Sequence, residues 1–325
     1  MTGARRTGAA DGPEPLARDD AREAGTRLHS VLGELEPEPG WLFYHEHLAI
    51  DLGPDRRLAD LDAVRESLVR LRSQGVTAVV DATGRGMGRD PRALAALQRD
   101  TGVAVVACAG YYVSDFHPPE TRGMEVEAIA QQLRWEVRTG LDGTAHRPGA
   151  IGELGGSFPL RPDECRVLRA GARVALTEDL ALLTHCQGGR GALAQLDLLE
   201  REGVRPDRVA LGHLDLLPPA LWAEVAEAAA RGAYVGIDTV GKAAYAPDSQ
   251  RLDLVAFLWE RGLGDRILVS TDISRDRYLR RHGGHGYEHL LATFVPDLEA
   301  RMGDRAVRAT LRTNPWRWLT GRPAP

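Results

Sequence analysis

The feature that most constrains the fold of this chain is a repeated alternation between short apolar runs and longer segments with helical spacing. Segments such as 58–75, 125–140 and 191–203 have helical spacing, and several of them end in glycine, the residue that commonly follows a helix C-terminus. Near-continuous apolar strands that alternate with helices predict a parallel sheet covered on both faces. The eight apolar runs occupy residues 42–47, 76–83, 103–110, 150–154, 180–186, 208–213, 233–238 and 267–272. Eight strand–helix units are the number found in a (β/α)8 barrel, or TIM barrel, and this α/β fold is the one we predict.

The alternative α/β architecture is an open, doubly wound parallel sheet. We prefer the barrel because no glycine-rich phosphate-binding fingerprint follows the first apolar run. We find no internal repeat and no interdomain linker, so a single domain is expected over residues 27–325. Residues 1–26 are rich in Arg, Ala, Gly, Asp and Pro, a composition that predicts a disordered tail. Residues 27–37 predict a short strand, a turn at Gly33 and a second short strand ahead of the barrel.

Composition narrows the classes of partner. A net charge of −5 gives no reason to expect binding to nucleic acid. No apolar run reaches the roughly 18–20 residues needed to span a bilayer, so we expect no membrane association. The three cysteines, Cys108, Cys165 and Cys186, are few and widely spaced, which favours free thiols in a reducing cytoplasm. We therefore expect a cytoplasmic protein, and the site residues described below imply a small molecule as its substrate.

Two histidines lie one residue apart within the apolar stretch WLFYHEHLAID, residues 41–51. Side chains of a strand alternate between its faces, so His45 and His47 are expected on one face together with Phe43, with Glu46 on the other. Two neighbouring imidazoles in a poorly solvated place would repel each other if charged, so we expect them to be neutral and to share a ligand such as a metal ion. A pair of this kind on its own is more simply a feature of the core, and the metal interpretation requires further ligands.

Those further ligands occur at the ends of other predicted strands, where the chemistry of such barrels is found. Taken singly, Glu153 and Asp272 could cap helices and His185 and His213 could be core histidines. Together with His45 and His47 they predict a metal site, and imidazole with carboxylate favours zinc or a similar divalent ion. Six ligands exceed one tetrahedral zinc and suit two ions about 3.5–4 Å apart, with one carboxylate between them.

The motifs that carry these residues resemble the phosphotriesterase family of the amidohydrolase superfamily. The matching stretches are HEHL, GELG, THC, GHLD and STD, and the resemblance extends over roughly residues 27–320. The resemblance is strongest to the branch called phosphotriesterase homology proteins. The stretches that indicate this branch are DTVGKAAYAPD, TDISRDRYLRRHGGHGYEHLLATFVPDL and TNPWRWL. That branch has a glutamate where organophosphate-degrading members have a carboxylated lysine, and Glu153 stands at this position.

The resemblance implies a role for each ligand. His45, His47 and Asp272 would hold the more buried of two divalent ions, expected to be zinc, and His185 and His213 the more exposed one. Glu153 would bridge the two ions, as would a hydroxide that attacks the substrate. Asp272 would also be catalytic, since it would take the proton of that hydroxide and pass it to the leaving group. Relatives often form homodimers, and we expect the same here.

The type of bond that the protein cleaves is undecided at this point. Organophosphate-degrading relatives relay a proton through a histidine just after the seventh strand, where this chain has Thr239. A lactone or carboxylic ester, including an anionic or phosphorylated lactone, is therefore our first expectation, because the leaving oxygen of an opened ring stays attached. The alternatives are an amidase that removes a small acyl group, a weak phosphotriesterase, and a metal-bound binding protein without activity.

Three further residues are candidates for substrate binding. Lactonase relatives have a tyrosine near Tyr112 that orients the substrate carbonyl, although this side chain could equally pack under a loop. Lys242 and Arg275 follow the seventh and eighth strands on the active face. These two cations could bind a carboxylate or phosphate of the substrate, or could simply be solvated surface residues.

Overall fold

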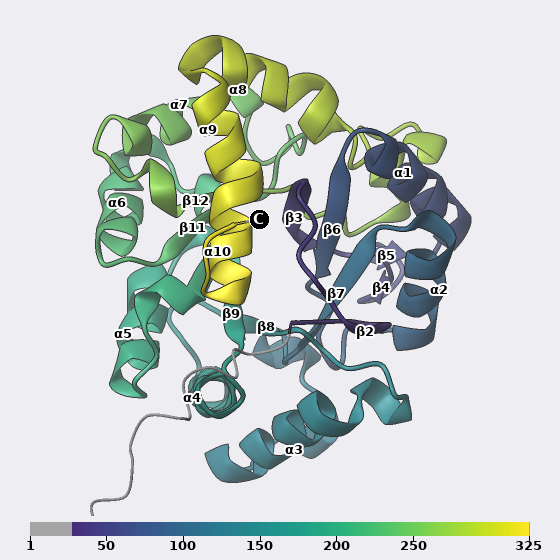
Figure 1. Ribbon diagram of the computed structural model, residues 1–325. Helices are drawn as coiled ribbons and strands as arrows, with labels where there is room; N and C mark the ends of the chain where they lie inside the picture. The colour runs from purple at the N-terminus through teal and green to yellow at the C-terminus, as the bar shows by residue number, and fades with distance from the viewer. Residues whose placement is uncertain (1–27, 325) are drawn as a thin grey trace, which may run out of the picture.

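Eight parallel strands form a nearly closed barrel in the computed structural model, which describes residues 28–324 (Figure 1). Each strand pairs with the next in chain order, and the first and last meet where the backbone N–H of Asp272 donates to the carbonyl of His45 at 3.2 Å. The predicted (β/α)8 fold is confirmed. The strands are β3 (Trp41–Glu46), β6 (Val76–Asp81), β7 (Ala104–Ala109), β8 (Ala150–Gly156), β9 (Ala181–Cys186), β10 (Val209–Gly212), β11 (Tyr234–Ile237) and β12 (Ile267–Val269).

Helices surround the barrel (Figure 1), and the first two, α1 (Leu61–Ser73) and α2 (Pro91–Thr101), begin at side-chain caps. The Asp60 side chain accepts a hydrogen bond from the Ala63 N–H at the start of α1, and Asp90 caps α2, which ends at Gly102 with a φ of 69°. The helices are α1 (Leu61–Ser73), α2 (Pro91–Thr101), α3 (Val126–Thr139), α4 (Pro162–Glu178), α5 (Ala192–Arg201), α6 (Trp222–Ala230), α7 (Asp248–Trp259), α8 (Val295–Met302), α9 (Asp304–Arg308) and α10 (Asn314–Thr320).

Two apolar clusters build the core. The larger one lies between strands and helices, and the smaller one fills the barrel interior. Trp316 and Trp318 of α10 belong to the interior cluster with Ala104 and Ala181, which begin their strands, and the Trp318 indole donates to the carbonyl of Leu182 at 3.1 Å. Helix α10 therefore closes the N-terminal end of the barrel and leaves its C-terminal end for the functional site.

Two small hairpins flank the barrel. The first, β1 (His29–Ser30) and β2 (Gly33–Glu34), is the predicted pair of short strands, but it turns at Val31 and Leu32, so the expected turn at Gly33 was wrong: Gly33 begins β2 and pairs with Ser30. The second, β4 (Ile50–Asp51) and β5 (Arg57–Leu58), follows β3. The tail predicted over residues 1–26 lies outside the described residues. Within residues 28–324, no helix combines the length and apolarity required to cross a bilayer.

The expectation that Phe43 shares a face with His45 was wrong. Phe43 packs in the outer cluster, whereas Tyr44 belongs to the barrel interior. Tyr44 and His45 both reach Asp238, although they are adjacent in sequence. The cause is a register shift between β3 and β6 after Phe43, which breaks the strict alternation of the strand.

Candidate metal centre

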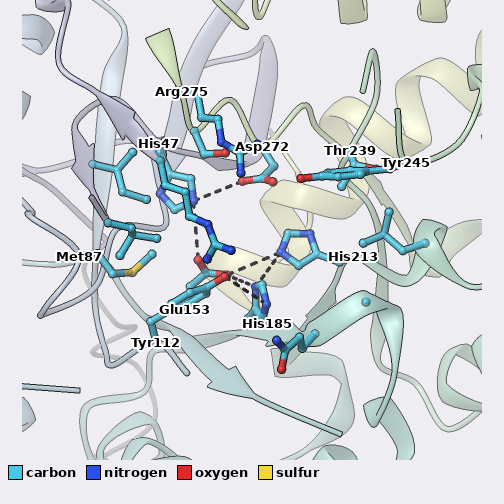
Figure 2. Close-up of a pocket in the computed structure, with 17 residues that line it drawn as sticks. His47, Met87, Tyr112, Glu153, His185, His213, Thr239, Tyr245, Asp272 and Arg275 are labelled. Atoms are coloured by element: carbon cyan, nitrogen blue, oxygen red, sulfur yellow. Dashed lines mark hydrogen bonds and ion pairs between the residues drawn. The ribbon is translucent and has the colours of Figure 1, made fainter. Parts of the chain in front are cut away.

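The six predicted ligands converge at the C-terminal end of the barrel, and Figure 2 shows five of them around one point. They come from the ends of five strands that are distributed around the barrel. All except Asp272 are buried, and the side chain of Asp272 is 13% exposed. The predicted ligands are His45 from β3, His47 just after it, Glu153 from β8, His185 from β9, His213 after β10, and Asp272 after β12.

Glu153 lies at the centre of this cluster. Its Oε1 atom is 3.6 Å from Nε2 of His47, and its Oε2 atom is 3.5 Å from Nε2 of His45. The same Oε2 atom is 3.1 Å from Nδ1 of His185 and 3.9 Å from Nε2 of His213. One carboxylate thus approaches four imidazoles with both of its oxygens, which is the arrangement expected of a ligand shared by two ions.

Two sets of three residues bring ligand atoms within 4.8 Å of one another. One set is His45, His47 and Asp272, the trio predicted for the more buried ion. The other is His45, Glu153 and His213. His185 adjoins the second set, because its Nδ1 atom is 2.8 Å from Nε2 of His213. The residues present could hold metal ions in both places.

Three histidines are oriented by hydrogen bonds on their outer nitrogens. Asp238, which the sequence analysis did not assign, places one oxygen 2.9 Å from Nδ1 of His45 and the other 2.7 Å from Nδ1 of His213. Thr83 lies 2.8 Å from Nδ1 of His47 in the same way. A neutral imidazole that donates from Nδ1 presents the Nε2 lone pair, and such partners commonly fix the orientation of metal-binding histidines.

The inner nitrogen of His45 supports a fit to a cation. This Nε2 atom is buried and has no hydrogen-bond partner within residues 28–324. A buried polar atom without a partner is costly. A lone pair aimed at a carboxylate gains a partner when a cation lies between the two groups, so the donor set suits a divalent ion with nitrogen and oxygen ligands.

The carboxylates of the centre are held in their charged form. Burial on its own would raise the pKa of Glu153, but His185 and His45 hold that pKa well below its usual range. Burial likewise opposes ionisation of Asp238, yet His213 and His45 hold its pKa well below the ordinary value. For Asp272 the ammonium of Lys242 outweighs burial and lowers the pKa. The centre therefore offers negative charge to a cation.

Two of the ligands have unusual backbone conformations. His213 has a φ of 66° and Asp272 a φ of 47°, both in the left-handed region that non-glycine residues seldom adopt. His213 directly follows β10 and approaches Glu153 at 3.9 Å, whereas Asp272 lies three residues after β12 and approaches His47 at 3.3 Å. Conformations of this kind persist where the surrounding structure enforces them, and they cluster at functional sites.

A cavity of about 370 Å³ opens above the centre. The hydroxyl of Tyr112 lies 3.3 Å from Nε2 of His185, and Tyr112 lines the cavity; its contact with a substrate carbonyl stays a prediction. Arg275 also lines the cavity (Figure 2). It donates to the Tyr278 hydroxyl at 2.6 Å. Arg56, between β4 and β5, contributes a second guanidinium that the sequence analysis missed because this residue follows no barrel strand.

Lys242 is placed differently from Arg275. Its ammonium pairs with Oδ2 of Asp272, and its side chain is only 2% exposed. Among the residues described, those that line the cavity include Asp272 and Tyr245 but not Lys242. The prediction that Lys242 binds substrate stays a prediction, and the structure adds a partner for it within the protein.

Thr239 is part of a buried network beside the centre. Its hydroxyl donates to Asp215 and accepts from Nη2 of Arg251 at 2.7 Å. Arg251 is fully buried and also donates to Asp215 at 2.7 Å, to Asp248 at 2.8 Å and to the carbonyl of Ala246 at 2.6 Å. Thr239 therefore serves to fix the segment between β11 and α7.

Replacing Arg251 with methionine should destabilise the fold by about 3–5 kcal/mol, because the substitution leaves the Asp215 carboxylate buried without its counter-charge. Chemical denaturation of the variant and the parent would measure this difference. Arg301→Met is the matched control, since Arg301 is exposed and pairs with the exposed Asp253. A loss below about 1 kcal/mol, typical of a surface pair, would contradict the role given to Arg251.

Comparison with known proteins agrees with the fold. The phosphotriesterase homology protein of Escherichia coli (strain K12) is 36% identical over 283 residues, which are 85% of this chain and 96% of that protein. Its crystal structure, complexed with phosphate in the active site, superposes with a TM-score of 0.83 at 35% identity and covers 86% of this chain and 98% of that one.

Two further proteins are similar to this chain. The N-acetyltaurine hydrolase of Rattus norvegicus is 35% identical over 275 residues, 80% of this chain and 78% of that protein. A lactonase from Listeria monocytogenes has a TM-score of 0.85 at 25% identity and covers 91% of this chain and 100% of that one. The family model described as Phosphotriesterase family matches residues 26–319. With nearly the whole barrel matched, the chain belongs to the phosphotriesterase family.

Proposed function

We propose that the protein is a metal-dependent hydrolase that cleaves the amide bond of small anionic N-acyl compounds. The observation that carries this proposal is a cavity of about 370 Å³ that has the histidine–carboxylate centre at its floor and the guanidinium groups of Arg56 and Arg275 in its lining. A small molecule with a carbonyl at one end and an anionic group at the other matches both. The similarity to N-acetyltaurine hydrolases supports an acylated amine as the substrate class.

Six residues would hold two divalent ions, which we propose to be zinc. His45, His47 and Asp272 would hold one ion, His185 and His213 the other, and Glu153 would contact both. When bound, such ions supply a water of lowered pKa and polarise the carbonyl of the substrate.

Side chains around the cavity would carry out proton transfer, stabilise the carbonyl oxygen and align the substrate. Oδ1 of Asp272, 3.3 Å from Nε2 of His47, would take the proton of the attacking water and deliver it to the leaving nitrogen. The Tyr112 hydroxyl would donate a hydrogen bond to the carbonyl oxygen as negative charge develops there. Arg275 would hold the anionic end of the substrate and thereby align the amide with Asp272.

Lactone hydrolysis is the second candidate, and the Thr239 network favours it. The hydroxyl of Thr239 is engaged by Asp215 and Arg251, so no proton relay runs outward through this position. A ring-opening reaction requires less proton transfer to its leaving group than amide cleavage does. The fold is also that of the Listeria lactonase.

A substrate panel decides between the two candidates. Zinc-loaded protein would be incubated with N-acetyltaurine, N-acyl amino acids, anionic and neutral lactones, and a neutral phosphotriester, with Glu153→Ala as the blank. Mass spectrometry would detect the addition of one water. Cleavage of N-acyl compounds is the expected result, whereas turnover confined to lactones would replace the amide proposal with the second candidate. Binding without turnover of any compound would contradict both.

Arg275→Met should raise KM for an anionic substrate by about 10- to 100-fold, because a hydrogen bond to a charged group contributes about 1.5–3 kcal/mol. Steady-state kinetics with N-acetyltaurine would measure the change, and neutral N-acetylethanolamine should show little effect. Arg277→Met, an exposed neighbour outside the cavity lining, is the control. An equal rise in KM for both substrates would show that Arg275 does not recognise charge.

Asp238→Asn should weaken metal binding by about 10- to 100-fold, the range typical of residues that orient metal-binding histidines. Both ions should be affected, because Asp238 orients His45 in one ligand set and His213 in the other. Competition with a fluorescent zinc chelator would measure the two affinities. A loss restricted to one ion would contradict the shared role of this carboxylate.

A further inference from the structure

Lys242 is the only lysine in the 325-residue sequence. The chain has 41 Lys and Arg residues in total, and every other one is arginine. The sequence thus strongly favours arginine over lysine. If a single lysine remained by chance, we would expect it on the surface, where most lysines lie. Lys242 is instead 3% exposed and beside the candidate metal centre. This combination indicates that the position requires an ammonium group in particular.

The contacts of Asp272 show what an ammonium could do there. Oδ2 of Asp272 pairs with Nζ of Lys242, while Oδ1 faces Nε2 of His47 at 3.3 Å. The two oxygens thus have different partners. A guanidinium has a planar fork that engages both oxygens of a carboxylate, whereas an ammonium is a compact point charge that can hold one. An ammonium on Oδ2 leaves Oδ1 available to the centre.

Lys242 is held firmly by its own segment. Its backbone N–H donates to the carbonyl of Thr239 at 3.0 Å, and its carbonyl accepts from Nη2 of Arg251 at 3.4 Å. Its ammonium lies 5.4 Å from the ring centre of Tyr278 and 5.9 Å from that of Tyr245, distances at which aromatic faces attract cations. The lysine is therefore placed by the same network that fixes the segment after β11.

We infer that Lys242 is a positioning residue for Asp272. It holds Oδ2 and directs Oδ1 toward the reacting atoms, while recognition of the anionic end of the substrate belongs to Arg275 and Arg56. The inference rests on the proposed hydrolytic function, and it assigns to the ammonium a task separate from substrate binding.

The kinetic test separates positioning from anion binding. Lys242→Met should lower kcat by about 10- to 100-fold, the range expected when a reacting group is displaced by about 1 Å, and should leave KM within about twofold. The loss should be equal for anionic N-acetyltaurine and neutral N-acetylethanolamine. A rise in KM limited to the anionic compound, with kcat retained, would overturn the inference in favour of a substrate contact.

Chemical rescue tests the need for a compact ammonium. Lys242→Cys should be as impaired as Lys242→Met, and alkylation with 2-bromoethylamine, which restores an amino group of nearly the same length, should recover most of the lost kcat. The parent protein treated with the same reagent controls for modification of Cys108, Cys165 and Cys186. Lys242→Arg should remain impaired, and full activity of that variant would overturn the inference.

A measurement without turnover distinguishes failure of this inference from failure of the proposed function. Protein grown with ¹³C-labelled lysine gives NMR signals from one lysine side chain, because the sequence has only one. These signals should shift in Asp272→Asn and should be unmoved by added taurine. A shift with taurine and none in Asp272→Asn would refute the positioning role, whether or not any amide is cleaved.

Discussion

Replacing Asp272 with asparagine is expected to lower kcat by about 10²- to 10⁴-fold, the contribution typical of a positioned proton-transfer group. Asparagine keeps the shape of the side chain but cannot accept and return a proton at Oδ1. KM should change little, because Arg275 and Arg56, rather than Asp272, are proposed to hold the anionic end of the substrate. Steady-state kinetics at saturating zinc, with metal content measured on the same samples, would establish both constants.

The control for this substitution is Asp253→Asn, which removes an exposed carboxylate paired only with Arg301 among the contacts of the described residues. It should leave kcat unchanged. If Asp272→Asn retained two ions and near-parental kcat, the proton would have to move through another group, and the catalytic role proposed for Asp272 would be refuted.

Exchanging Glu153 for glutamine is expected to weaken metal binding by more than about 100-fold, a larger effect than the roughly 10- to 100-fold typical of residues outside the ligand set. Glutamine lacks the charge and the second acceptor oxygen that allow Glu153 to approach four imidazoles at once. The bound metal should fall from two ions per chain to one or none, and turnover should fall with it.

Metal content after dialysis against a weak chelator would measure this loss. A second readout is thermal stability, because ions that bind only the folded state raise Tm and a chelator should lower it in the parent. In Glu153→Gln that chelator effect should be small. Glu136→Gln, which alters a buried carboxylate paired with Arg89 away from the centre, is the control. A variant that kept both ions would show that Glu153 is not shared between them.

Much of the fold was predictable because it depends on local patterns. The eight apolar runs specify strands wherever both faces are buried, and the glycine and aspartate residues at helix ends mark their boundaries. The six histidines and carboxylates were recognisable as a set because parallel strands bring their ends to one side of a barrel. Phe43 was predicted on the wrong face of its strand. A register shift after Phe43 turns the consecutive residues Tyr44 and His45 inward, and the alternation of apolar and polar residues does not reveal such a shift.

Other parts of the site depend on tertiary contacts. Asp238 follows β11 at the same level as the ligands, and that position was a usable signal, but its pairing with both His45 and His213 exists only in the closed barrel. Arg56 reaches the cavity from a hairpin outside the strand ends. Lys242 pairs with Asp272 because of the path that its loop takes after β11. Arg251 of α7 holds that loop through the carbonyl of Lys242.

The seam between β3 and β12 has a consequence for biosynthesis. His47 and Asp272 are about 225 residues apart, and at a translation rate of about 5–20 residues per second they leave the ribosome roughly 10–45 s apart. Throughout that interval the first histidines lack Asp272 and the strand that closes the barrel beside them. The ion proposed for His45, His47 and Asp272 can therefore enter only a chain that is nearly complete, and a nascent chain halted before β12 should emerge without it. Metal loading in the cell would then report on the completion of synthesis.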